Sequence, residues 1–467
     1  MVTSKPHEHS GLQAALDAQR ERWNVPGVAV GMLSNGKRET VASGVTSLET
    51  GNPVRPDTLF QIGSISKVFC ATLVMTLVDE GLVNLDAPVS TYLQDITFQD
   101  AAAADGITLR RCLSHSSGLY GDYFGDFGWG DDALALSMPG FADLWQWFAP
   151  GSDWAYNNAG FNLAGRVVEV VTGQTFEAAM HARVFEPLGL TRTFYFAHEA
   201  IVYSVAVGHG LVTPGSAEHE VATSYPLPRS VNPAGGIISS VDDLLTFAEF
   251  HMGDGTINGR QVLTPESVRA MQEAQITAAC WADEWGIGWD LKTVDGERMI
   301  SHGGTTNGFQ AQLHVVPARG FAIIIFTNSG RGHALNRNMG LWALRNVLGL
   351  EAADRPTHPL TTAELERFTG VYRQPQAEIT VSIAPGGDTL LIDAVSYSPL
   401  ADTRTASPTV EVTPIGPSEF FTDNGTGGGR RIDFQDQPGA ARDAKAWRVR
   451  VGGRMSERDD SANATSA

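Results

Sequence analysis

The sequence is poor in cysteine and lysine and lacks any long apolar run. Its three cysteines, Cys70, Cys112 and Cys280, lie far apart, which argues against a disulfide framework or a thiolate zinc site; we expect buried free thiols. No stretch approaches the roughly 20 apolar residues of a membrane helix, so no membrane contact is expected. The first residues contain no apolar core of a secretory signal, which favours a cytoplasmic protein.

The charge balance is strongly acidic. A formal net charge of −19 over 467 residues repels nucleic-acid phosphate and anionic lipid, so we expect no nucleic-acid partner. The positive charge is nearly all arginine, since lysine occurs only at positions 5, 37, 67, 292 and 445. Only Lys67 lies inside a strongly apolar segment, which makes it the first candidate for a catalytic lysine.

Two well-known catalytic motifs are missing. There is no Gly-x-Ser-x-Gly nucleophile elbow and no His-Glu-x-x-His zinc motif. The histidines show no metal-ligand spacing. We therefore expect a mechanism with no metal and no cofactor.

The order of predicted elements indicates an α/β sheet with an inserted helical lobe, followed by a small β domain. Helix-start signals occur at Ser239 to Asp243 and at Thr264-Pro265. The expected elements are a helix over 10–23, a hairpin over 25–44 with an Asn35-Gly36 turn, a buried helix over 68–78, helices with long loops over 85–230, strands between 285 and 326, a helix over 335–348 and short strands after 370. The predicted domains are 1–352 and 353–455, with a disordered tail over 456–467.

Ser64 and Lys67 are three residues apart at the start of the predicted buried helix. This spacing puts a hydroxyl and an amine on one helix face, where an amine with a lowered pKa can deprotonate a serine. The spacing alone is weak evidence, because Ser34 and Lys37 share it across a hairpin turn. Most serine–lysine pairs at this spacing are surface residues with no catalytic role, so the assignment of Ser64 and Lys67 as a catalytic pair depends on further motifs.

Tyr156-Asn157-Asn158 is the only Tyr-x-Asn among the nine tyrosines. A phenol beside an ammonium can relay a proton to a leaving group, and an amide two residues away can orient a substrate carbonyl. The alternative is a loop tyrosine that anchors the start of a helix.

His302-Gly303-Gly304-Thr305 follows a short predicted strand. Its paired glycines allow a substrate backbone to approach, and its N–H groups would form half of an oxyanion hole, with the Ser64 N–H as the other half. The alternative is a glycine-rich turn with a solvent-exposed histidine. The second histidine motif, around His115, is interpreted as structural.

Ser64-x-x-Lys67, Tyr156-x-Asn158 and His302-Gly303-Gly304, in this order, resemble the motifs of the serine β-lactamase and penicillin-binding superfamily. The resemblance is to its class C-like branch, which includes D-aminopeptidases, D-peptidases and class VIII esterases, and covers about residues 10–350. Segments 113–119, 232–236 and 285–289 support it. It implies an antiparallel sheet flanked by helices plus an all-helical lobe. The C-terminal β domain is similar to the lipocalin-like barrel of several peptidases and peptide cyclases.

The resemblance also implies roles for the motif residues. Ser64 would be the acylated nucleophile, Lys67 and Tyr156 would share the acid/base work, and Asn158 would bind the substrate amide. His302 to Thr305 would form the substrate-facing strand edge, with the Thr305 N–H completing the oxyanion hole.

One departure from the family pattern bears on the substrate. β-Lactamases usually have Lys-Thr-Gly where this chain has His302-Gly303-Gly304, and that lysine helps hold the substrate carboxylate. The expected activity is therefore hydrolysis of amide or peptide bonds, with D-amino-acid-containing peptides as substrates. A carboxylesterase, a peptide-cyclising acyltransferase, a weak β-lactamase and a non-catalytic binding protein are the alternatives. The sequence leaves the oligomeric state open.

Overall fold

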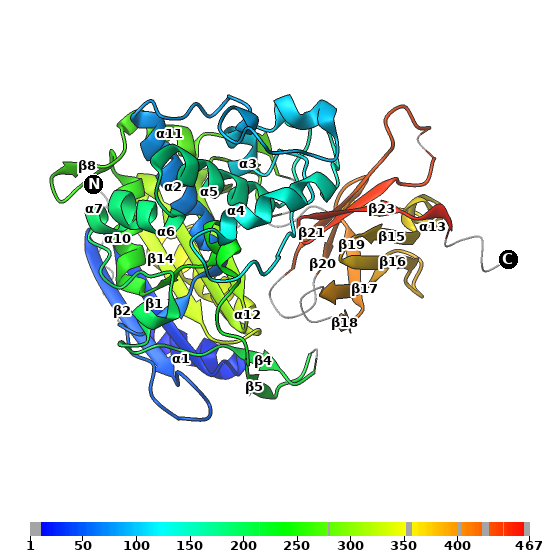
Figure 1. Cartoon of the computed structure of the whole chain (residues 1–467). Helices are drawn as coiled ribbons and strands as arrows, with labels where there is room; N and C mark the ends of the chain where they lie inside the picture. The colour runs from blue at the N-terminus through cyan, green and yellow to red at the C-terminus, as the bar shows by residue number, and fades with distance from the viewer. Residues whose placement is uncertain are drawn as a thin grey trace, which may run out of the picture.

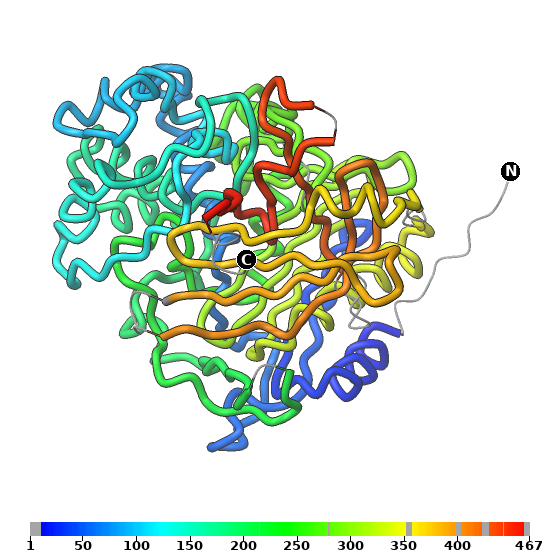
Figure 2. Tube along the Cα trace, turned by 90° about the vertical axis from the view of Figure 1, so that its right-hand side faces the viewer, coloured from blue at the N-terminus to red at the C-terminus, as the bar shows by residue number. Residues whose placement is uncertain are grey.

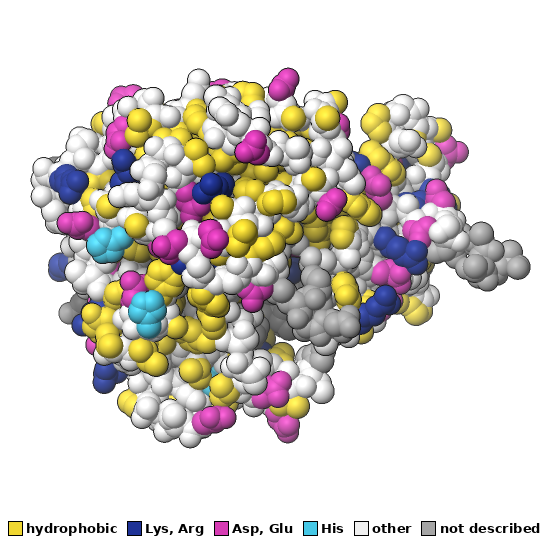
Figure 3. Space-filling model, in the orientation of Figure 1, with side chains coloured by type: hydrophobic (Ala, Val, Ile, Leu, Met, Phe, Trp, Pro, Cys, Tyr) yellow, Lys and Arg dark blue, Asp and Glu magenta, His cyan; other side chains and the backbone are white. Residues whose placement is uncertain are grey.

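The computed structural model describes residues 11–213, 215–278, 281–351, 357–398, 403–422, 429–441 and 443–461. Figure 1 shows a larger body of sheet and helices beside a barrel formed by the C-terminal residues. On the face drawn in Figure 3, acidic and basic side chains are scattered among hydrophobic ones. Among the described residues, no helix has the length and apolar character that crossing a membrane requires.

An antiparallel sheet of eight strands forms the centre of the larger body, in the order β2-β1-β14-β13-β12-β11-β10-β9. The predicted hairpin is confirmed: Ser34 pairs with Lys37, and Asn35 and Gly36 form the turn with φ of 52° and 72°. Ser34 and Lys37 thus face each other across a turn between two strands and do not lie on a helix. The strands are β1 (Gly27–Ser34), β2 (Lys37–Gly44), β9 (Ile276–Thr277), β10 (Glu284–Trp285), β11 (Asp290–Val294), β12 (Glu297–Thr306), β13 (Phe309–Val316) and β14 (Phe321–Thr327).

Both faces of this sheet are covered, because alternate side chains of a strand point to opposite sides. Ile323 and Ile325 of β14 pack with α1 (Leu12–Trp23) and α12 (Gly332–Ala343). Ile324 and Phe326 join the main core with α10 (Val241–Met252). The uninterrupted apolar run of β14 is therefore explained by burial on both sides.

The helical lobe follows β2 and rests on the second face of the sheet, as Figure 1 shows. At its centre is α2 (Ser66–Asp79), which is apolar nearly all round and fully buried except near its end. The predicted helix caps are confirmed, since Ser240 accepts from the Asp243 N–H and Thr264 from the Ser267 N–H. The other helices of this body are α3 (Leu109–Leu113), α4 (Ala133–Ser137), α5 (Ala159–Thr172), α6 (Phe176–Met180), α7 (Glu186–Leu188), α8 (Ala197–Ala200), α9 (Asn232–Gly235) and α11 (Pro265–Gln272). Two-stranded pairs join β3 (Phe60–Gln61) with β6 (Ile238–Ser239), β4 (His209–Leu211) with β5 (His219–Val221), and β7 (Thr256–Ile257) with β8 (Arg260–Gln261).

The C-terminal body is a closed barrel of eight antiparallel strands, as the resemblance predicts. Neighbouring strands follow one another along the chain, β15 pairs with β23, and β16 pairs with β17, so the sheet has no open edge apart from the side strand β18. After the short helix α13 (Thr362–Leu365), the strands are β15 (Gly370–Gln374), β16 (Ala377–Ile383), β17 (Leu390–Ser398), β18 (Thr403–Ala406), β19 (Val410–Pro414), β20 (Glu419–Thr422), β21 (Arg431–Gln435), β22 (Arg448–Val451) and β23 (Arg454–Arg458).

The predicted disordered tail from residue 456 is wrong for its first part. β23 continues to Arg458, and Ser456 is buried. The Arg458 guanidinium donates to the backbone carbonyls of Thr369 and Ala446, which holds this polar segment in the barrel. Residues 462–467 and the predicted domain boundary at 352/353 lie outside the described residues.

The barrel contacts the larger body through its β21–β23 strands, and Figure 2 shows it in front of the sheet and lobe. Arg450 of β22 forms ion pairs with Asp433 of the barrel and with Asp153 of the lobe, at 2.8 and 3.1 Å. Gln435 donates to Asp153 as well. The prediction of buried free cysteines is confirmed for Cys70 and Cys112, whereas Cys280 is outside the described residues.

Candidate active site

Ser64 lies where the sheet meets the lobe. It belongs to a 3-10 turn (Gly63–Ile65) that runs directly into α2. Between Thr58 and Leu77 it is the only residue that is not buried. The Lys67 Nζ lies 3.1 Å from the Ser64 Oγ and donates to the Ala234 carbonyl of α9 at 2.7 Å. The predicted pair is therefore in contact at the surface end of a buried helix.

Lys67 is fully buried. Its Nζ stands 5.0 Å from the centre of the Tyr156 ring and 5.5 Å from that of Phe161. Burial lowers the pKa of Lys67 well below its usual value, the charge of Arg454 lowers it further, and Asp122 opposes the change. A neutral amine beside a serine hydroxyl can act as a base at moderate pH.

Tyr156 and Asn158 come from the loop before α5. Both are at least 95% buried. Burial raises the pKa of Tyr156, although its hydrogen bond with Ser64 and the charge of Arg454 act in the other direction. The phenol therefore keeps its proton at neutral pH. The Asn158 Nδ2 donates to Asp122 at 2.8 Å, a contact that the sequence did not predict.

The third motif lies on β12, packed against the turn that carries Ser64. Gly63 has φ of +53°, and a Cβ there would lie 2.7 Å from the Thr305 nitrogen. A Cβ on Gly304 would lie 1.8 Å from the Ile62 carbonyl oxygen and 3.2 Å from the Ser64 nitrogen. Both positions thus require glycine, and their close packing places the backbone nitrogens of Ser64 and Thr305 near each other. Gly303 precedes Gly304 on β12.

His302 is buried on this strand, so the alternative of a turn with an exposed histidine is wrong. Its Nδ1 is 2.6 Å from the Gly303 carbonyl oxygen, and its Nε2 has no hydrogen-bond partner among the described residues. Burial lowers the pKa of His302 to about 4, and the nearby Lys67 contributes to this change. The imidazole is therefore neutral at physiological pH, and its Nε2 is an unused acceptor.

Sequence reasoning missed the barrel's contribution to this site. The β22–β23 turn approaches Tyr156: the Gly453 carbonyl accepts from the Tyr156 N–H at 2.8 Å. The Arg454 guanidinium lies 4.7 Å from the centre of the Tyr156 ring and donates to both carboxylate oxygens of Asp122, at 3.0 and 3.1 Å. Asp122 thus links Arg454 to Asn158. The glycine pair Gly452-Gly453 was a signal for a hairpin turn, but nothing local indicated where that turn would dock.

His115 has the structural role that was predicted. Its Nδ1 accepts from the Asn157 N–H at 2.9 Å, and its ring packs 4.4 Å from that of Tyr156. Burial keeps the pKa of His115 well below its usual value, so the ring stays neutral. His115 therefore supports the loop that carries Tyr156.

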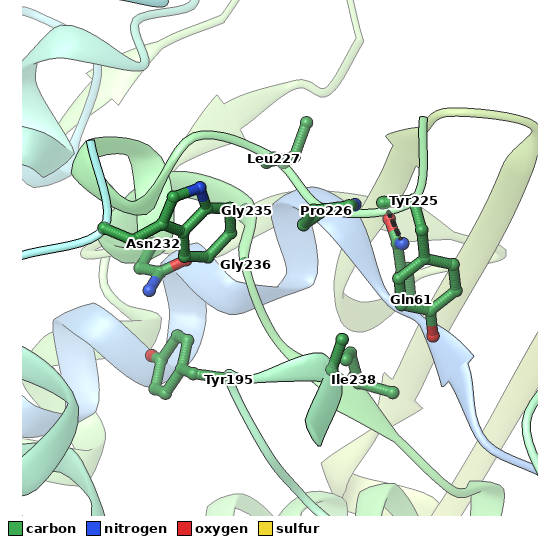
Figure 4. Close-up of a pocket in the computed structure, with 11 residues that line it drawn as sticks. Gln61, Tyr195, Tyr225, Pro226, Leu227, Asn232, Gly235, Gly236 and Ile238 are labelled. Atoms are coloured by element: carbon green, nitrogen blue, oxygen red, sulfur yellow. Dashed lines mark hydrogen bonds between the residues drawn. The ribbon is translucent and has the colours of Figure 1, made fainter. Parts of the chain in front are cut away.

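A small cavity lies beside Ile238 of β6 and Gly235 of α9, and Figure 4 shows residues of its lining. The Gln61 amide donates to the Tyr225 carbonyl, and the hydroxyls of Tyr195 and Tyr225 are buried without a partner among the described residues. The cavity volume of about 10 Å³ has room for one water molecule and is too small for a substrate.

The antiparallel sheet, the helical lobe and a serine–lysine pair at their junction define a β-lactamase-like class of protein. Consistent with this, the Beta-lactamase family model matches residues 12–344. Penicillin-binding protein 4 of Amycolatopsis lactamdurans is 38% identical over 332 residues, covering 70% of this chain and 86% of that relative. The chain therefore belongs to the β-lactamase family.

Solved structures extend the likeness to the barrel. The crystal structure of SurE matches with a TM-score of 0.73 at 25% identity, over 96% of this chain and 99% of SurE. D-amino acid amidase from Ochrobactrum anthropi SV3, solved with L-phenylalanine, matches with a TM-score of 0.62 at 23% identity, over 73% of this chain and 100% of that one. The second likeness concerns the fold alone.

Proposed function

We propose that this protein is a serine hydrolase that forms an acyl-enzyme on amide or peptide bonds, with D-amino-acid-containing peptides as its substrates. The observation that carries the proposal is the 3.1 Å contact between the hydroxyl of the partly buried Ser64 and the fully buried amine of Lys67. Membership of a family that includes β-lactamases and penicillin-binding proteins supports it.

In the proposed acylation, the neutral Lys67 amine takes the Ser64 proton as the Oγ attacks the substrate carbonyl carbon. The resulting oxyanion accepts hydrogen bonds from the N–H groups of Ser64 and Thr305, whose close packing is described above. One such donor is commonly worth about 3 kcal/mol of transition-state stabilisation. Collapse of the intermediate breaks the C–N bond and leaves the acyl group on Ser64.

The leaving amine needs a proton, and Tyr156 is suited to give it. Its raised pKa keeps it a neutral phenol, and its ring adjoins the Lys67 amine, so the proton gained by Lys67 can restore the phenol. Lys67, neutral again, then takes a proton from the water that attacks the acyl-enzyme and passes it to the Ser64 Oγ as the acyl C–O bond breaks, which regenerates the free enzyme. Lys67 thus serves both half-reactions, and Tyr156 serves the first.

Two features favour peptides over β-lactams. The lysine that holds a substrate carboxylate in β-lactamases is replaced by His302, whose pKa of about 4 leaves it uncharged at neutral pH. The barrel also borders the site through Gly453 and Arg454, which gives an extended substrate additional surface. A carboxylesterase, a peptide-cyclising acyltransferase, a weak β-lactamase and a binding protein are the competing functions.

The test is a substrate panel of matched D- and L-amino-acid amides and peptides, p-nitrophenyl butyrate and a chromogenic cephalosporin. Among the amides and peptides, we expect the highest kcat/KM on the D-configured members, and we expect loss of turnover in Lys67→Ala. Lys37→Ala is the matched control, because Lys37 has the same spacing from a serine but lies exposed on the hairpin. Turnover of the ester without turnover of any amide or peptide would favour the carboxylesterase, and added amine acceptors would reveal acyl transfer.

A further inference from the structure

His115 has a backbone conformation that histidine rarely adopts. Its φ is +57°, in the left-handed region that favours glycine and asparagine, and the residue is fully buried. Backbone strain of this kind persists only where the surrounding structure holds the residue in place, and it is concentrated at functional sites. The contacts of His115 therefore bear on what the strained conformation serves.

Two hydrogen bonds join His115 to the loop that carries Tyr156. The His115 carbonyl accepts from the Ala155 N–H at 3.0 Å, and the His115 Nδ1 accepts from the Asn157 N–H at 2.9 Å. Of the four backbone N–H groups of residues 155–158, three donate to backbone carbonyls, and that of Asn157 alone donates to a side chain. A change of side chain at position 115 can therefore remove one anchor of this loop and leave the other three in place.

The imidazole of His115 is enclosed by aromatic rings. Its centre is 4.4 Å from that of Tyr156, 4.8 Å from that of Trp285 and 5.3 Å from that of Phe161. Because Nδ1 accepts a hydrogen bond, the proton of the neutral ring belongs on Nε2, which has no partner among the described residues. The bond from Asn157 is thus the one that orients this ring within the described part of the chain.

The loop matters because it fixes the Tyr156 hydroxyl. This hydroxyl is hydrogen-bonded with Ser64, and the Tyr156 ring lies 5.0 Å from the Lys67 amine. Proton transfer requires a heavy-atom distance of about 2.6–3.2 Å, so a displacement of about 1 Å interrupts it. Loss of the acceptor would leave the buried Asn157 N–H unpaired, which favours a shift of the loop.

We propose that His115 is a positioning residue for the general acid: by accepting from the Asn157 N–H, its Nδ1 holds Tyr156 where it can protonate a leaving amine. The proposal rests on the proposed acyl-enzyme function and specifies which bonds depend on His115. When an amide C–N bond breaks, its electron pair goes to the nitrogen, which takes the proton of the Tyr156 hydroxyl. An activated ester releases p-nitrophenolate as a stable anion, and this step needs no such proton. His115 is therefore needed for amide cleavage and much less for cleavage of an activated ester.

The experiment uses the full chain and two substrates with the same acyl group, the p-nitroanilide and the p-nitrophenyl ester of acetyl-D-alanine. His115→Asn and His115→Gly are matched variants: both residues suit the left-handed backbone and lack the ring, but only asparagine offers an acceptor in the place of Nδ1. His115→Gly should lower kcat/KM for the anilide by at least about 100-fold, the lower end of what a general acid contributes, and for the ester by less than about fivefold. His115→Asn should stay within about fivefold of the wild type on both substrates. Thermal unfolding and fluorophosphonate labelling of Ser64 check that both variants fold.

A second background shows whether His115 acts through Tyr156. In Tyr156→Phe, the addition of His115→Gly should cause no further loss on the anilide. If His115→Gly does not fold, His115→Ala takes its place with the same expected result. No loss in the glycine variant, an equal loss on the two substrates, or an asparagine variant as poor on the anilide as the glycine variant would overturn the positioning role. Absence of Ser64-dependent cleavage of the anilide by the wild type would instead overturn the proposed function.

Discussion

Removing the charge of Arg454 should weaken Lys67 as a base. In Arg454→Met the side chain keeps much of its length and apolar contact with Tyr156, but the positive charge near the Lys67 amine is lost. Because that charge lowers the pKa of Lys67, its removal raises this pKa. The protonated, inactive amine then persists to higher pH, so the acidic limb of the pH–activity profile moves to higher pH.

The size of this effect follows from the geometry. The Lys67 Nζ and the Arg454 guanidinium stand 5.0 and 4.7 Å from the centre of the same ring, so they are at most about 10 Å apart. At an effective dielectric constant of about 20, that distance gives at least about 1.7 kcal/mol, or slightly more than one pH unit. Asp122 opposes part of this, and the Arg454 side chain is 27% exposed, which increases screening. We therefore expect the acidic limb of the pH–activity profile to move by about half to one pH unit.

The assay is the second-order rate constant for labelling Ser64 with a fluorophosphonate, measured against pH. This reports the free enzyme and needs no knowledge of the natural substrate. Arg454→Lys keeps the charge and is the control, so its limb should stay close to that of the wild type. An Arg454→Met profile that is lower at every pH but not displaced would refute the electrostatic reasoning and leave Arg454 a purely structural role.

The remaining predictions concern the strand edge and the junction. Gly304→Ala should lower kcat/KM for p-nitrophenyl butyrate by at least about 100-fold, because it disturbs the N–H groups that stabilise the oxyanion. Gly303→Ala is the control: its added Cβ would approach no atom closer than 3.5 Å, so its kcat/KM should stay near that of the wild type. Thermal unfolding checks that both variants fold. His302→Lys should raise the rate of acylation by a fluorescent penicillin about tenfold by restoring a cation for the carboxylate, and an unchanged rate would contradict our interpretation of the histidine. Arg450→Met should lower the free energy of unfolding, measured with denaturant, by about 3–5 kcal/mol, because it leaves Asp433 buried without its partner. A decrease below about 1 kcal/mol would show that water takes the place of the arginine.

The architecture of the chain was predictable because its signals are local. The Asn35-Gly36 turn, the apolar helix α2 and the caps at Ser240 and Thr264 each depend on a few adjacent residues. The barrel was predictable from short alternating segments. The end of β23 was not, because its few residues are polar and only their contacts across the barrel hold them.

The three motifs of the candidate site were also found from the sequence, and the structure brings them together. What escaped prediction depends on docking: Asp122 and Arg454 are 332 residues apart and meet only because the barrel packs on the lobe. The burial of His302 depends in the same way on surrounding aromatic side chains such as Trp285 and Tyr156. Such contacts leave no periodic or local pattern in the sequence.

The most direct test of the account is to identify the acylated residue. The full chain is mixed with p-nitrophenyl butyrate, quenched with acid within the first turnovers, and analysed by intact and peptide mass spectrometry. The account predicts one butyryl group on Ser64 in the wild type and in Ser34→Ala, and none in Ser64→Ala. A butyryl group on another residue, or equal labelling of Ser64→Ala, would contradict it.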